Sequence, residues 1–73
     1  MKTLDEVKNE YERQVEIFLQ NHPAELLMFR ELWGAGEFRR AYVVVQEATR
    51  NFGLVMSADM DKADDDFFWM YMH

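Results

Sequence analysis

Three helix breakers divide this sequence into four segments, each short enough to form a single helix. The breakers are Asn21-His22-Pro23, Gly34-Ala35-Gly36 and Gly53. A residue before proline avoids the helical region, and glycine adopts the left-handed conformation that ends many helices. This punctuation predicts a chain of short elements joined by tight turns.

Residues 3–20 carry the clearest helical pattern. Thr3-Leu4-Asp5-Glu6 fits a capping box, in which the Thr3 hydroxyl accepts from the Glu6 amide and the Glu6 carboxylate accepts from the Thr3 amide. Apolar residues recur behind it at helical spacing: Leu4, Val7, Tyr11, Val15, Phe18 and Leu19. We expect a helix over 3–20.

Two further helices are expected over 23–33 and 37–52. Pro23 suits a first helical position, where its missing donor is not needed. The apolar positions of the two segments are Leu26, Leu27, Phe29, Leu32 and Trp33, and then Phe38, Ala41, Tyr42, Val45, Ala48 and Phe52. Residues 42–45 have β propensity, but the longer helical period favours a helix that ends at Gly53.

Residues 54–73 join a cluster of aspartates to a block of aromatics and methionines. Five aspartates against Lys62 give residues 57–73 a net charge of −4, out of −6 for the whole chain. As a helix, this segment has Ser57 as its N-cap and acids in its first turn. Its apolar face then consists of Met60, Ala63, Phe67, Met70 and Tyr71. The alternative is a β-hairpin that pairs 54–56 with 67–69.

The size and composition indicate one domain over residues 1–73. The chain is 49% hydrophobic and 15% aromatic, which is well above the apolar content of disordered chains. We expect an all-α fold, a small antiparallel bundle of three helices with the C-terminal segment docked across it. A chain of this length buries only about 60–65% of its unfolded surface. Some apolar side chains must therefore remain outside, where a contiguous patch indicates an interface.

The charge and the lack of cysteine limit the cellular compartments and the kinds of partner that we expect. No cysteine is present, which excludes disulfides and thiolate sites and favours the cytoplasm. No run of eighteen apolar residues exists and no signal peptide is expected, so no membrane contact is predicted. A pI of about 4.7 argues against direct nucleic-acid binding and favours a protein with a basic surface.

The metal-binding motif that the sequence matches best is a calcium-binding loop, but the match is incomplete. Asp59-Met60-Asp61 begins like an EF-hand loop. Ala63, Asp64 and Met70 then stand where that loop needs an oxygen ligand, a glycine and a glutamate. No calcium site is predicted.

The other catalytic and cofactor motifs are also lacking. His22 and His73 are the only histidines, and neither has a second one at zinc-ligand spacing. The only serine, Ser57, is explained as a cap. Gly34-Ala35-Gly36 lacks the lysine of a phosphate-binding loop. We expect no enzyme activity, no metal and no cofactor.

One short segment resembles a known repeat. Gly36, Phe38, Ala41 and Ala48 occupy the places of the turn glycine, the aromatic residue and the two small alanines of a tetratricopeptide repeat. The resemblance covers about 15 residues, and no second repeat follows. It implies a helical hairpin around the Gly34-Ala35-Gly36 turn and carries no function.

Residues that suit partner binding gather in the last seventeen positions. Aspartates supply charge complementarity and aromatics supply anchor contacts. The predicted partner-binding residues are Asp59, Asp61, Asp64, Asp65, Asp66, Phe68, Trp69 and Tyr71. Arg39 and Arg40, the only adjacent basic pair, are expected to face outward. They form either a solvated face or a secondary patch for an acidic partner or the acidic tail of a second copy.

The function predicted from these features is protein binding. Small, acidic, cysteine-free chains are similar in size and charge to phage or mobile-element inhibitors of host machinery, which include mimics of nucleic acid. The expectation is a module that occupies a basic protein surface. The alternative is a homo-oligomeric structural or adaptor protein, such as a dimer, whose aromatic tail is a self-association element.

Overall fold

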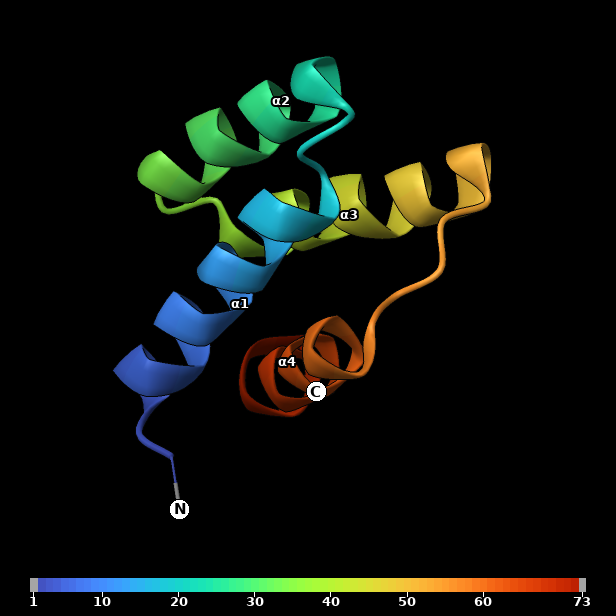
Figure 1. The fold of residues 1–73 in the computed structure, drawn as a ribbon. Coiled ribbons are helices and arrows are strands. Elements are labelled where there is room, and N and C mark those ends of the chain that lie inside the picture. Colours follow the sequence, from blue (N-terminus) through green and yellow to red (C-terminus); the bar gives the residue numbers. More distant parts are fainter. Residues whose placement is uncertain (1, 73) are drawn as a thin grey trace. The chain divides into compact units, whose positions relative to one another are not determined.

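The computed structural model describes residues 2–72, and every regular element in that range is helical (Figure 1). The elements are α1 (Leu4–Phe18), α2 (Pro23–Gly34), α3 (Phe38–Phe52), α4 (Ala58–Phe67) and the π-helical turn η1 (Phe68–Met72). The all-α prediction is confirmed. Residues 2–72 contain no strand, so the hairpin alternative for 54–56 and 67–69 is wrong.

The chain forms two compact units. Unit 1 consists of residues 1–18 and 56–73, and unit 2 consists of residues 19–55. Ten acidic and four basic side chains belong to unit 1, whereas unit 2 has four of each. The formal net charge of −6 therefore resides entirely in unit 1, and unit 2 is neutral.

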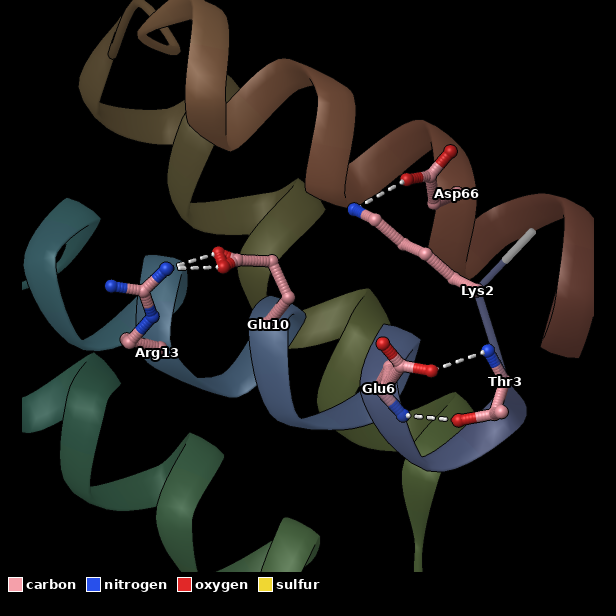
Figure 2. Close-up of polar contacts among 6 residues, drawn as sticks. All are labelled: Lys2, Thr3, Glu6, Glu10, Arg13 and Asp66. Carbon is pink, nitrogen blue, oxygen red and sulfur yellow. Dashed lines mark hydrogen bonds and ion pairs between the residues drawn. The ribbon is translucent and has the colours of Figure 1, made fainter.

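α1 begins at the predicted capping box (Figure 2). The Thr3 amide donates to Glu6 Oε1 at 3.0 Å, and the Glu6 amide donates to Thr3 Oγ1 at 3.2 Å. These reciprocal bonds satisfy two donors that a helix start otherwise leaves unpaired. The hydrogen bonds from the Thr3 backbone and side chain lower the pKa of Glu6.

Unit 2 contains the helical hairpin that the repeat resemblance implies. α2 and α3 pack against each other, and a short turn reverses the chain between them (Figure 1). Gly36 has φ +78°, a value that favours glycine, and its amide donates to the Trp33 carbonyl at 3.1 Å. Trp33 also contacts Phe38 edge-to-face, with ring centroids 4.8 Å apart. The turn and this aromatic pair fix where α3 begins relative to α2.

α3 ends at Gly53, as its position predicts. Gly53 is left-handed, with φ 62° and ψ 37°, and its amide donates to the Thr49 carbonyl. The predicted apolar stripe is confirmed at Ala41, Val45 and Ala48, which are buried. It is wrong at Phe52, which is 49% exposed and lies against the His22 ring with centroids 4.5 Å apart. Phe52 is the last residue of α3, and it packs on His22, which precedes α2, instead of on the buried side of α3.

In unit 1, α1 packs against α4, although they are separated by more than 35 residues of sequence. The Tyr11 and Phe67 rings stack with centroids 4.4 Å apart and an interplanar angle of 11°. Both side chains are fully buried. Val7, Met60 and Ala63 are buried on the same two helices. This aromatic pair joins α1 to α4.

Substitution of Phe67 tests the importance of this contact. Phe67→Ala removes a fully buried ring and should lower the free energy of unfolding by about 3 kcal/mol or more. Phe68→Ala is the matched control, because the adjacent ring is 37% exposed. It should cost less than about 1 kcal/mol. Urea denaturation monitored by circular dichroism measures both values, and equal effects would contradict the inward orientation of Phe67.

Glu6 provides a pH-dependent test of the capping box. Its pKa is lowered in the folded state, so its stabilising effect is present at neutral pH and is lost as the pH falls through the folded-state pKa. The melting temperature of the wild type should exceed that of Glu6→Gln at neutral pH, and the difference should shrink in acid. Melting curves from neutral to acidic pH check this, and a difference that does not change with pH would refute the role of the Glu6 charge.

Candidate protein-binding surface

The aspartate cluster begins on a well-capped helix. Ser57 is the N-cap of α4, and its Oγ accepts a hydrogen bond from the Met60 amide at 3.1 Å. Asp59 and Asp61 occupy the first turn, where negative charge interacts favourably with the helix dipole. The predicted helix with a Ser57 cap is confirmed.

The aromatic block that follows contains both buried and exposed rings. Phe67 is buried, and the half-buried Tyr71 stacks on it with ring centroids 4.7 Å apart. Phe68 is 37% exposed and Trp69 is 57% exposed, and their rings meet edge-to-face at 5.8 Å. Tyr71 thus extends the Tyr11–Phe67 stack, whereas Phe68 and Trp69 form an outward pair.

Met70 is exposed, contrary to its predicted place on the buried face of this helix. The expectation assumed α-helical spacing throughout. The chain changes to a π-helical turn at Phe68, where hydrogen bonds span five residues instead of four. The wider turn advances each residue less around the axis. This change moves Met70 off the buried stripe, while Tyr71 stays stacked on Phe67.

The five aspartates do not share one face of α4. Asp59, Asp61 and Asp65 are exposed, and Asp64 and Asp66 are half-buried. Lys2 forms an ion pair with Asp66, with 3.3 Å between Nζ and Oδ2, and this contact connects the segment before α1 to α4 (Figure 2). The negative charge of Asp59 helps to raise the pKa of Arg13 on α1, after the larger effect of Glu10. Asp61 and Asp65 are exposed and make no ion pair within residues 2–72.

Four of the eight predicted partner-binding residues form an exposed acid–aromatic stretch of α4 and η1. Asp61 and Asp65 are four residues apart on α4 and so lie on the same side of it, and Phe68 and Trp69 follow on η1. We define the acid–aromatic face as Asp61, Asp65, Phe68 and Trp69, which are all exposed. Asp59, Asp64, Asp66 and Tyr71 lie outside it. The face has carboxylates at its N-terminal end and aromatic rings about one turn further on.

A shallow hollow of about 400 Å³ borders this face. It is lined by Lys2, Val7, Lys62, Asp66, Trp69 and Met70. The hollow is large enough for an apolar side chain of a partner to enter beside Trp69. Sequence reasoning missed Lys2 and Val7 here, because no local pattern links residues at the start of α1 to α4.

The polar side of α1 next to α4 carries both signs of charge. Arg13 donates to both carboxylate oxygens of Glu10, a contact that lowers the pKa of Glu10 (Figure 2). A cavity of about 250 Å³ here is lined by Lys2, Glu10, Arg13, Gln14, Asp59, Lys62 and Ala63. Its lining carries three basic and two acidic side chains. Within residues 2–72, no three acidic or histidine side chains gather as a metal-binding group.

The predicted secondary basic patch lies in unit 2. Arg39 and Arg40 are exposed in the first turn of α3, as expected. The guanidinium of Arg40 lies 3.7 Å from the Glu37 carboxylate and forms an ion pair with it. Arg39 makes no ion pair within the described part of the chain. A positive charge is therefore available on unit 2.

Comparisons with known proteins give no match: no protein-family model, no curated protein and no solved structure is similar to this chain. None of the helices described between residues 2 and 72 is long and apolar enough to cross a membrane.

Tryptophan fluorescence tests the exposed aromatic pair. Trp69 is 57% exposed and Trp33 is 9% exposed. Trp33→Phe leaves Trp69 as the only tryptophan, and its emission should be red-shifted and readily quenched by acrylamide. Trp69→Phe leaves Trp33, whose emission should be blue-shifted and protected. Equal quenching in the two variants would show that Trp69 is not on the surface.

Proposed function

We propose that this chain is a small acidic protein-binding module that inhibits or modulates a partner by occupying the partner's basic surface. The observation that carries the proposal is the acid–aromatic face. It combines two outward carboxylates with a large exposed aromatic pair on a single helical segment. The small antiparallel bundle expected for residues 3–20, 23–33 and 37–52 would serve as its scaffold.

Electrostatics favours a basic partner. The whole net charge of −6 belongs to unit 1, which carries the face. The electrostatic field of this concentrated charge raises the rate of encounter with a positive surface. Added salt screens the field and lowers that rate. The same field repels nucleic acid, so the partner is a protein, including one whose basic surface normally binds nucleic acid.

The aromatic pair supports specific binding. Tryptophan is among the residues that most often dominate binding energy when they are buried at the centre of an interface. Trp69 is presented on regular structure, because η1 continues from α4 and α4 packs on α1 through the Tyr11–Phe67 stack. A preformed face loses little conformational entropy on binding.

The kind of process follows only by analogy. Small acidic chains without cysteine are similar in size and charge to phage or mobile-element inhibitors of host proteins. In that setting the chain acts in the cytoplasm of the producing or infected cell, without catalysis and without a cofactor.

A comparison of binding by matched variants tests this function. Immobilised wild type, Asp61→Asn/Asp65→Asn and Trp69→Ala are compared as baits in cell extract. A purified retained protein is then titrated against each variant at low and high salt. We expect the double variant to lose about tenfold in affinity and part of its salt dependence.

Asp5→Asn/Glu31→Gln is the control, because it removes the same charge from exposed positions outside the face. It should retain most of the affinity. If the control and Asp61→Asn/Asp65→Asn bind equally well, net charge alone explains retention and the proposed face is wrong.

The second candidate function, a homo-oligomeric structural or adaptor protein, is favoured by one specific observation. Unit 2 has a groove whose basic and apolar parts are complementary to the acid–aromatic face.

A further inference from the structure

The groove lies between α2 and α3 within unit 2. Its volume is about 360 Å³. It is lined by Met28 and Leu32 from α2 and by Arg39, Arg40, Val43, Val44 and Glu47 from α3. Met28 is 53% exposed and Val43 is 45% exposed, so both present apolar surface to solvent. An exposed apolar groove of this kind is a common site for an amphipathic helix.

The charge changes from positive to negative along the groove. Arg39 and Arg40 lie at the N-terminal end of α3, Val43 and Val44 follow one turn later, and Glu47 stands at the other end. A guest segment with acids at one end and apolar residues at the other fits in one orientation only. Its acids would meet the arginines, and its acid-free end would lie near Glu47.

The acid–aromatic face has the same order of charged and apolar residues as the groove. Asp65 and Trp69 are four residues apart, and so are Arg39 and Val43. The acids precede the aromatics along α4 and η1, as the arginines precede the valines along α3. A guest helix lying parallel to α3 would therefore place Asp61 and Asp65 near the arginines while Phe68 and Trp69 cover Val43 and Met28.

We infer that the α2/α3 groove is a docking site for the acid–aromatic face of a second copy of this chain. Charge complementarity carries this assignment. If two acid–aromatic faces met each other, aspartates would oppose aspartates and repel. A contact between the face of one copy and the groove of another pairs opposite charges and covers apolar surface on both. Reciprocal exchange of two such contacts makes a closed dimer, whereas one-way exchange makes longer assemblies.

A charge-reversal experiment tests this inference. Sedimentation equilibrium is measured at high micromolar concentration, at low and high salt, for wild type, Arg39→Glu/Arg40→Glu and Asp61→Lys/Asp65→Lys. The wild type should associate, and salt should weaken the association. Each variant alone should associate at least about tenfold more weakly, because it loses complementary charge.

The mixture of the two variants gives the decisive result. The reversed groove of one variant complements the reversed face of the other, so the mixture should form heterodimers that neither variant supports as a homodimer. Arg30→Glu/Arg50→Glu is the charge-matched control, because both residues are exposed and neither lines the groove. It should associate like the wild type.

Three results would overturn the inference. They are a wild type that remains monomeric, an association that Arg39→Glu/Arg40→Glu does not weaken, and a mixture of variants that stays monomeric. If the wild type remains monomeric, the groove binds an acidic segment of another protein or has no partner.

Failure of this inference is separate from failure of the proposed function. Arg39→Glu/Arg40→Glu leaves the acid–aromatic face intact, so it should bind the basic partner at least as well as the wild type does.

Discussion

The stack of Tyr11, Phe67 and Tyr71 is the interaction on which unit 1 depends. Its rings come from α1, from the end of α4 and from η1, with successive centroids 4.4 and 4.7 Å apart. The stack brings together two ends of the sequence that no turn connects. By turning Phe67 and Tyr71 inward, it also determines which aromatic residues are turned outward. The exposure of Phe68 and Trp69 is thus a consequence of packing and not of a loose tail.

Three of the five aspartates lie where they do little for the helix that carries them. Asp64, Asp65 and Asp66 lie near the C-terminal end of α4, where negative charge opposes the helix dipole. Asp61 and Asp65 are four residues apart, a spacing at which like charges cost about 0.2–0.5 kcal/mol. Lys2 offsets the charge of Asp66, whereas Asp65 makes no ion pair within residues 2–72. A local arrangement that lowers stability without an internal gain points to a role outside the fold.

Local sequence signals predicted the elements well and their contacts less well. The capping box at Thr3, the Ser57 cap and the left-handed Gly53 depend on neighbouring residues, so spacing alone revealed them. The Lys2–Asp66 ion pair joins residues 64 positions apart, and no local pattern encodes it. The exposure of Met70 also escaped prediction, because a π-helical turn has no clear sequence signature and the apolar periodicity was extended straight through it. Half of the predicted site residues nevertheless belong to the acid–aromatic face, because the Ser57 cap and the buried stripe of Met60, Ala63 and Phe67 were predicted correctly.

The two proposed contacts use the same face, which links them through mass action. A chain whose face is held in the groove of another copy cannot present that face to a basic partner. Its apparent affinity for the partner then falls in proportion to the fraction of chains whose face is uncovered. Dilution would uncover the face, and an excess of a sufficiently basic partner would displace the second copy. Self-association would therefore keep exposed aromatic surface covered at high concentration and release it when the chain is scarce relative to its target.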